Sequence, residues 1–444
     1  MCLPIGSILP LRPCFFGEIG CLILRRCTRL VGSPALMRRG GRWLQWTAPS
    51  PNRRAKKEYT MLRPIPSKRL GLIPPTSEYP AESNGAGRKP LGGPFIPIYK
   101  KRRVVLIDNE LVKKAHILLD EEESADRFSG AVLIAHDNQP ILTTARGYAI
   151  HPEVLRNQPN TKFNIASVTK MLTAVAVMQL VANGKLELYV PIAIYNPDLP
   201  YANQITIHQL LTHTAGFDEY WNDAYRAARS DLRTIADYLK LFADTPLEFP
   251  PGTRHHYGNS GYVILGALIE QVTGISYYEH MRREIFRLVG MKDTDFHEMD
   301  LLITNCAVGY TRENWFGPID GQLRNNHFIY GVKGSPSEHC FSTVHDLFLF
   351  FQALQSQRLL DTYHTELCFT PHASAEQSGV SYGYGFHIID DGKHGHVIGH
   401  GGRALGGDAF ALMYDLGYTV IILSNYDRPS ARNVLNRIAD MLIT

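Results

Sequence analysis

One segment of this chain is apolar on almost every side when it is drawn as a helix. Residues 171–182 read MLTAVAVMQLVA, so apolar side chains occupy nearly every position of each turn. A helix with almost no polar face has to be buried in the middle of a domain. The Asn183-Gly184 pair that follows is typical of a helix end. The sequence therefore predicts a folded domain built around this helix.

Strand and helix patterns on both sides of this helix predict an α/β domain of the α+β type. Residues 130–149 read as two strands around an Asp-Asn turn, which is typical of a hairpin. Helical patterns fill much of residues 205–295 and residues 342–355. Strand patterns return in residues 382–425, before a closing helix with Pro429 near its first turn. We expect one mainly antiparallel sheet flanked by helices, with an inserted mainly helical lobe.

The first 104 residues differ from the rest in composition and charge. Residues 1–103 hold 20 of the 46 Lys and Arg residues but only 4 of the 42 Asp and Glu residues. They are rich in Pro and Gly and lack a sustained period, so we expect a largely disordered extension. A basic arm can bind nucleic acid, but no known nucleic-acid motif accompanies this charge. We therefore expect a basic extension at 1–104, a folded domain at 105–444 and no nucleic-acid partner.

The sequence also limits the environment in which the chain works. No apolar run reaches the roughly 18 residues that a membrane-spanning helix needs. The seven cysteines are scattered without CxxC spacing, which favours reduced thiols over a disulfide framework. An apolar stretch follows Arg12, but Glu18 interrupts it, so we do not predict a signal peptide. The location stays open: cytoplasmic as the chain is written, exported if its start is assigned wrongly. The oligomeric state is open as well.

Ser167 and Lys170 lie three residues apart at the start of the apolar helix. If the helix begins near Ser167, both side chains share a face and Lys170 Nζ reaches Ser167 Oγ. The free N–H groups at a helix N-terminus can stabilise an oxyanion. An apolar setting lowers the pKa of a lysine, so that the neutral amine can act as a base. The alternative is a capping serine with a surface lysine, and the S-x-x-K spacing alone does not decide between them.

Two more short stretches carry candidate functional residues. Tyr257 and Asn259 precede a helical pattern, on a loop of the kind that often carries catalytic groups. The phenol can pass protons, and the amide can offer a donor and an acceptor to a substrate. His400 and Gly402 lie in a Gly-rich strand pattern, where a strand edge can supply an N–H to an oxyanion hole. In isolation, a turn tyrosine that packs its ring is the better explanation of Tyr257. A bulge or a turn is the alternative for His400 and Gly402.

Together, Ser167-x-x-Lys170, Tyr257-x-Asn259 and His400-x-Gly402 resemble the three ordered motifs of the serine β-lactamase and penicillin-binding family, in its class C-like branch. The stretches LLTHTAGF, PGTRHHYGNSGYVILGALIEQVTG and LSNYD are also similar to family hallmarks. The resemblance covers about residues 108–444. It implies a β-lactamase/transpeptidase-like fold and a serine hydrolase that needs no cofactor or metal. Its substrates would be small molecules or short peptides: short esters, D-Ala-type peptides or β-lactams.

The resemblance also implies a role for each of the catalytic residues. Ser167 would be the acylated nucleophile, and Lys170 would be the base that activates it. Tyr257 would relay a proton to the leaving group and help to activate the water that releases the acyl group. The backbone N–H groups of Ser167 and Arg403 would form the oxyanion hole.

The substrate-binding residues include departures from the family pattern. Asn259 would hold the substrate amide, and His400 with Gly402 would stand where classical lactamases have Lys-Thr-Gly. A histidine at this position weakens the case for binding a β-lactam carboxylate, although Arg403 could restore a positive charge. Residues 338–339 are Glu-His where relatives commonly have two glycines, so this bulky pair is expected to narrow or reshape the cleft. We therefore expect esterase or D-amino-acid peptidase activity rather than efficient β-lactamase activity.

Other classes of protein remain as alternatives. A zinc hydrolase would use histidines such as those at 255–256 and 394–400, but neither group has a carboxylate at ligand spacing and H-E-x-x-H is missing. An α/β-hydrolase would need a G-x-S-x-G elbow, which is also missing. His213 fits a structural turn better than a catalytic base. A non-catalytic protein of the same fold that binds peptidoglycan or another ligand stays open.

Overall fold

A computed structural model gives the structure of the chain. It describes residues 36–39, 42–45, 109–152, 154–314, 317–318, 321–375, 379–390 and 392–443. Within these ranges no helix is both long and apolar enough to cross a membrane.

Two short strands lie in the basic N-terminal part of the sequence. β1 (Leu36–Arg39) and β2 (Arg42–Gln45) pair antiparallel as a hairpin. The sequence pattern did not predict these strands. The rest of residues 1–104 lies outside the described residues, so its predicted disorder stays a prediction.

The main domain is built on one antiparallel sheet of eight strands in the order β13-β14-β15-β16-β17-β18-β3-β4. The predicted hairpin is present: β3 and β4 flank Asp137 and Asn138, whose φ angles of 47° and 62° suit a tight hairpin turn. The strands from the two ends of the domain meet where β18 pairs with β3. The strands are β3 (Gly130–His136), β4 (Gln139–Arg146), β13 (Ala373–Ser374), β14 (Val380–Tyr382), β15 (His387–Asp390), β16 (His396–Ala404), β17 (Gly407–Tyr414) and β18 (Tyr418–Ser424).

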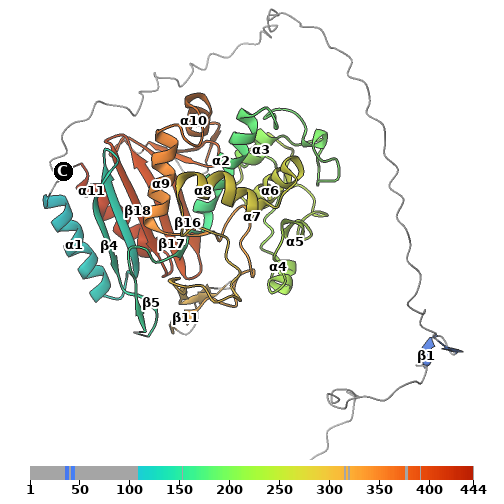
Figure 1. Ribbon diagram of the computed structural model, residues 1–444, viewed down its shortest axis with the longest axis horizontal. Coiled ribbons are helices and arrows are strands. Elements are labelled where there is room, and N and C mark those ends of the chain that lie inside the picture. Colours follow the sequence, from blue (N-terminus) through green and yellow to red (C-terminus); the bar gives the residue numbers. More distant parts are fainter. Residues whose placement is uncertain are drawn as a thin grey trace, which may run out of the picture. The chain divides into compact units, whose positions relative to one another are not determined.

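Helices cover both faces of this sheet (Figure 1). One face packs on α1 (Asn109–Ser124) and α11 (Ser430–Met441), and the other lies toward α2 (Thr169–Ala182) and α9 (Val344–Gln355). Side chains alternate along the strands, so that Leu133 of β3 faces the α2 side and Val132 faces the α1 side. The core therefore has two parts, one on each face of the sheet.

The helical lobe lies on the α2 side of the sheet (Figure 1). In the sequence it is inserted between β4 and β13 of the large sheet. Its helices are α3 (Ile207–Leu211), α4 (Asp223–Ala228), α5 (Ile235–Leu239), α6 (Ser260–Thr273), α7 (Tyr277–His280) and α8 (Arg287–Val289). Another helix, α10 (Thr362–Phe369), follows α9. Short paired strands complete the domain: β5 (Tyr148–Ile150) with β6 (Leu155–Arg156), β7 (Phe163–Asn164) with β12 (Phe341–Ser342), β8 (Tyr310–Thr311) with β11 (Arg324–Asn325), and β9 (Glu313–Asn314) with β10 (Gly317–Pro318).

The helix α2 is buried as its sequence predicts. Nearly every residue from Thr169 to Leu180 is buried, Lys170 among them. A short 3₁₀ turn, η1 (Ala166–Val168), precedes the helix, and Gly184 follows its end in the left-handed conformation with φ of 65°. The turn before β15 packs tightly on α2, because a Cβ atom on Gly385 would lie 2.4 Å from Ala174 Cβ.

Two glycine substitutions test how closely this turn fits α2. Gly184 and Gly385 both have positive φ, but a Cβ atom on Gly184 would meet nothing within 4 Å. Gly184→Ala should lower the free energy of unfolding by about 1–2 kcal/mol through backbone strain. Gly385→Ala should lower it by about 1–3 kcal/mol more, because α2 is overpacked as well. Urea unfolding of both variants measures the difference, and equal losses would contradict this packing.

Candidate active site

Ser167 lies in the 3₁₀ turn η1, between strand β7 and helix α2. Its side chain is half-buried and contributes to the wall of a cavity of about 700 Å³. The preceding residue, Ala166, has a φ of 45°, which is rare for a residue with a Cβ atom. The Asn164 side chain accepts the Ala166 N–H at 2.8 Å, and Thr169 Oγ1 donates to Ala166 O at 2.6 Å. These hydrogen bonds stabilise the strained backbone at Ala166, and the turn directs Ser167 toward the cavity.

Lys170 lies one helical turn after Ser167 and is fully buried. Its Nζ atom lies 3.1 Å from Ser167 Oγ, 2.6 Å from Asn259 Oδ1 and 3.0 Å from Ser337 O. The last two oxygens can only accept hydrogen bonds. A neutral amine has two protons and one lone pair, so both protons are used by these acceptors and the lone pair is left for the Ser167 hydroxyl. The arrangement therefore suits a lysine that takes a proton from Ser167.

Burial lowers the pKa of Lys170 to about 8. The carboxylates of Glu338 and Glu219 act in the opposite direction, since negative charge favours the ammonium form. Burial outweighs both carboxylates. A large fraction of Lys170 is thus neutral in mildly alkaline solution.

Tyr257 faces the same amine. Lys170 Nζ lies 4.8 Å from the centre of the Tyr257 ring, and the buried Tyr257 hydroxyl has no partner at hydrogen-bond geometry among the described residues. Burial raises the pKa of Tyr257 well above its ordinary value, although the nearby Ser167 hydroxyl opposes this shift. Tyr257 is therefore a phenol with a proton to give, rather than a phenolate.

Asn259 begins helix α6, and neighbouring residues hold its amide at both ends. Its backbone N–H and Nδ2 both donate to Glu219 Oε2, at 3.1 Å and 2.9 Å. Its Oδ1 atom accepts from Lys170. The amide is thus oriented by the site itself, whereas the sequence suggested that it was available to a substrate.

His400 on β16 faces Tyr257 as an uncharged ring. Its Nδ1 atom lies 2.5 Å from Gly401 O, which only accepts, so Nδ1 carries the proton and Nε2 accepts from the Tyr382 hydroxyl at 3.1 Å. Burial lowers the pKa of His400 well below its ordinary value. His400 therefore brings neither a positive charge nor a free N–H to the cavity.

Gly402 brings β16 into contact with the nucleophile turn. A Cβ atom on Gly402 would lie 2.4 Å from Ile165 O and 3.2 Å from Ser167 N, so only glycine allows this approach. The neighbouring β15 pairs with β16 as far as Gly399, which leaves the following stretch of β16 beside Ser167 as an edge among the described strands. The Arg403 side chain is 63% exposed, and its Nη2 lies 3.7 Å from Glu313 Oε2. Its charge is directed toward Glu313 rather than toward Ser167.

The structure brings the residues predicted from the sequence together. Six of them line the cavity of about 700 Å³, and Lys170 lies behind Ser167; the six are Ser167, Tyr257, Asn259, His400, Gly402 and Arg403. His213 packs its ring 4.4 Å from that of Tyr257 and accepts the Gly258 N–H at 3.4 Å, which agrees with a structural role. In the part of the chain that the structure describes, no three His, Cys, Asp or Glu side chains are placed to hold a metal ion.

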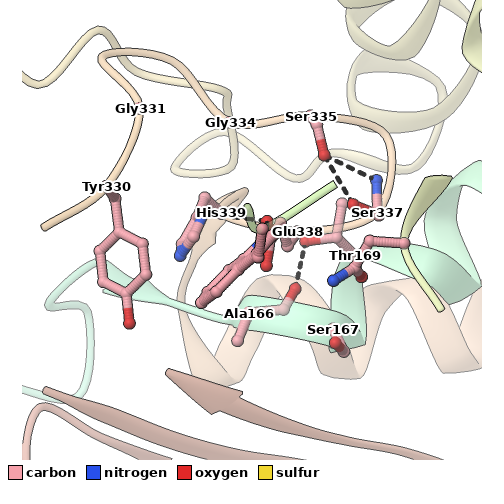
Figure 2. A network of polar contacts seen from close by, with 12 residues as sticks. Ala166, Ser167, Thr169, Tyr330, Gly331, Gly334, Ser335, Ser337, Glu338 and His339 are labelled. Atoms are coloured by element: carbon pink, nitrogen blue, oxygen red, sulfur yellow. Dashed lines mark hydrogen bonds and ion pairs between the residues drawn. The ribbon is translucent and has the colours of Figure 1, made fainter. Parts of the chain in front are cut away.

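Sequence reasoning missed Glu219 and Trp221, which also line the cavity, whereas it had singled out the 338–339 pair, of which Glu338 lines the cavity as well. Glu338 is buried, and its Oε1 atom accepts from Tyr220 Oη at 2.5 Å and from Trp221 Nε1 at 2.6 Å. His339 is buried, and Figure 2 shows it beside Tyr330. Its ring also stacks on that of Trp221, with 6.1 Å between the ring centres. The pair is thus folded into the cavity wall. The available signal was an acidic residue before two aromatic residues, Glu219-Tyr220-Trp221, on a loop close to Tyr257.

Comparison with known proteins agrees with this geometry. The family model described as "Beta-lactamase" matches residues 117–443. Penicillin-binding protein 4* of Bacillus subtilis (strain 168) is 28% identical over 330 residues, covering 70% of this chain and 72% of that protein. The crystal structure of a penicillin binding protein from Bacillus halodurans superposes with a TM-score of 0.66 at 29% identity, over 74% of this chain and 98% of that one.

A third comparison shows the likeness of fold alone. The D-amino acid amidase of Ochrobactrum anthropi SV3, complexed with L-phenylalanine amide, superposes with a TM-score of 0.65 at 24% identity. The match covers 75% of this chain and 97% of that one.

The state of Lys170 predicts how the reactivity of Ser167 depends on pH. If the neutral amine is the base for Ser167, protonation removes it as the pH falls through a pKa of about 8. The second-order rate constant for labelling of Ser167 by a fluorophosphonate should fall about tenfold for each pH unit below that value. Intact-mass spectrometry follows the labelling. Lys170→Met, which keeps an apolar stem, should react slowly at every pH. A wild-type rate that stays flat from pH 8 to pH 5 would rule out this base.

Proposed function

Because the chain belongs to the β-lactamase family, we propose that it is a serine hydrolase that works through an acyl-enzyme at Ser167. The observation that carries this proposal is the environment of Lys170 Nζ, 3.1 Å from Ser167 Oγ with both of its amine protons directed to Asn259 Oδ1 and Ser337 O. This arrangement prepares the lone pair for the serine proton.

Acylation begins when Ser167 Oγ attacks the carbonyl carbon of the substrate and its proton passes to Lys170. The carbonyl oxygen becomes an oxyanion, which accepts from the backbone N–H groups of Ser167 and Arg403. The closeness of Gly402 to Ser167 N supports this pairing of donors across η1 and β16. The C–O or C–N bond to the leaving group then breaks as the carbonyl re-forms.

Tyr257 supplies the proton that the leaving group needs. Its raised pKa keeps the phenol protonated, and the Lys170 ammonium returns a proton to it after transfer. In the second step a water attacks the acyl carbonyl and gives its proton, through Tyr257, to the neutral Lys170 amine. The Lys170 ammonium passes that proton to Ser167 Oγ, so that Ser167 leaves as the alcohol, Lys170 is neutral again and the acid product is released.

The charges beside Ser167 favour esters over β-lactams, whereas Arg428 and Arg432 line other parts of the cavity. A β-lactam carries a carboxylate close to its reacting carbonyl, and His400 offers it no charge because the ring is neutral. Arg403 lies beside Glu313, and Glu219 adds negative charge near Ser167. The likeness to a putative D-alanyl-D-alanine carboxypeptidase of Salmonella heidelberg (strain SL476), 29% identical over 257 residues, supports peptide substrates as a class. On charge, short esters rank ahead of nitrocefin. D-Ala-D-Ala peptides end in a carboxylate of the same kind, so their place in the ranking rests on the likeness to relatives and not on charge.

A substrate panel tests this function and separates it from the alternative, a binding protein of the same fold. Short nitrophenyl esters, D-Ala-D-Ala peptides and nitrocefin are each mixed with the protein, and intact-mass spectrometry detects an acyl adduct. We expect an adduct and turnover with at least one ester or peptide, and a lower kcat/KM for nitrocefin.

Matched serine variants provide the control for this panel. Ser167→Ala should abolish both the adduct and turnover. Ser356→Ala, on the surface at the end of α9, should retain both. Absence of turnover and of fluorophosphonate labelling in the wild type would favour the binding protein. Full turnover by Ser167→Ala would show that the nucleophile is a different residue.

A further inference from the structure

We propose that the segment Glu219–Trp221, on the loop between α3 and α4, is a positioning element for this reaction. Its three side chains hold the two oxygens that accept the protons of Lys170, and so they keep the amine lone pair directed at Ser167. The inference rests on the proposed serine hydrolase function and extends it to residues that do not touch the reacting atoms.

Glu219 fixes the first of these oxygens through Asn259. Its Oε2 atom accepts both the backbone N–H and the Nδ2 of Asn259, at 3.1 Å and 2.9 Å, and its Oε1 atom accepts the Tyr220 N–H at 2.9 Å. A carboxylate has no proton to donate, so it accepts only the nitrogen side of the amide. Asn259 Oδ1 is thereby forced toward Lys170. A flipped amide would instead offer Nδ2 to the amine lone pair and compete with the Ser167 hydroxyl.

Tyr220 and Trp221 fix the second oxygen, which belongs to Ser337. The turn that carries it closes on itself, since Ser335 N donates to Glu338 O at 3.0 Å and Glu338 N donates to Ser335 O at 3.1 Å. Tyr220 Oη donates to Glu338 at 2.5 Å and lies 3.1 Å from the hydroxyls of Ser335 and Ser337. Trp221 Nε1 donates to the same Glu338 oxygen. Figure 2 shows this turn above the start of α2, with Ser337 and Glu338 toward Thr169 and Ser167.

Glu338 gains a specific function from this arrangement. Two donors converge on its Oε1 atom, and His339 Nδ1, 3.9 Å away, brings no charge because burial lowers the pKa of that ring to about 3. The carboxylate therefore serves as the anchor by which the 335–338 turn is tied to residues 220 and 221. A glycine at this position would leave the turn without that anchor.

The charged and titratable groups around Lys170 come from several elements. They are Glu219, Glu338, Tyr257, Tyr262, His213, His339, His387 and His400. Burial keeps the four histidines neutral and the two tyrosines protonated. The two glutamates are the groups whose charge bears on the amine, and burial raises the pKa of each to about 7. Removing the Glu219 charge should therefore make Lys170 easier to deprotonate.

A double-mutant cycle tests whether Glu219 acts through Asn259. Glu219→Ala should lower kcat/KM for the best ester about 100-fold, because the amine is misplaced. Asn259→Ala should lower it at least as much, and the double variant should be no slower than Asn259→Ala alone. If the fold losses in kcat/KM of the two single variants multiply in the double variant, the two residues act independently and the proposal is wrong. A Glu219→Ala variant within twofold of the wild type would also overturn it.

Two milder variants keep the test interpretable if Glu219→Ala folds poorly. Glu219→Gln keeps the shape, so its rate loss should be smaller, but the acid limb of its kcat/KM profile should move to lower pH by about one unit. Tyr220→Phe removes one hydroxyl and should slow the reaction about tenfold. If the acid limb of Glu219→Gln does not move and Tyr220→Phe reacts at the wild-type rate, the segment is only a structural part of the cavity wall and the proposal is wrong.

A surface carboxylate at the start of α4, directly after this loop, supplies the matched control. Asp223 is 93% exposed, and Asp223→Asn should leave the rate and the pH profile unchanged. Fluorophosphonate labelling of the wild type separates the two levels of the argument. If the wild type is labelled and kcat/KM of Glu219→Ala is unchanged, only the positioning element is wrong. If the wild type is not labelled, the proposed function is wrong.

Discussion

Burial of the Lys170 amine is the constraint on which the rest of this site depends. Helix α2 has no polar face to offer, so a lysine on its first turn loses its water and needs acceptors from the surrounding loops. Asn259 Oδ1 and Ser337 O supply them. These acceptors come from α6 and from the turn before β12, which explains why several distant segments converge behind one serine.

The same set of residues determines the charge beside Ser167. The ring of His400 is neutral and hydrogen-bonded to Tyr382, while Arg403 pairs with Glu313 at the rim. Glu219 and Glu338 leave carboxylates close to the nucleophile. Their negative charge favours the ammonium form of Lys170 and so opposes the lowering of its pKa. The same carboxylates hold the residues that orient the amine. The charge distribution and the geometry of the base are therefore two results of the same set of residues.

Much of the fold, and the candidate catalytic residues, could be predicted from local sequence. The apolar run predicted that α2 is buried, and the Asp-Asn pair predicted the β3–β4 turn. The order of the three motifs predicted that Ser167, Lys170 and Tyr257 belong to one site. The residues that hold the acceptors of Lys170 could not be predicted, because Tyr220 and Trp221 reach Glu338 across 118 and 117 residues of sequence only when two loops pack. The direction of the Asn259 amide likewise depends on a neighbour that no spacing rule identifies. The β1–β2 hairpin had no recognisable pattern.

The most direct test of this account is a titration of Lys170 itself. NMR of protein labelled at the lysine side-chain carbon next to Nζ, with Lys170→Met to assign the signal, measures its pKa without a substrate. We expect the Lys170 signal to titrate near pH 8. A Lys170 signal that titrates at the ordinary lysine value of about 10.4 would contradict the claim that the buried amine is the base for Ser167.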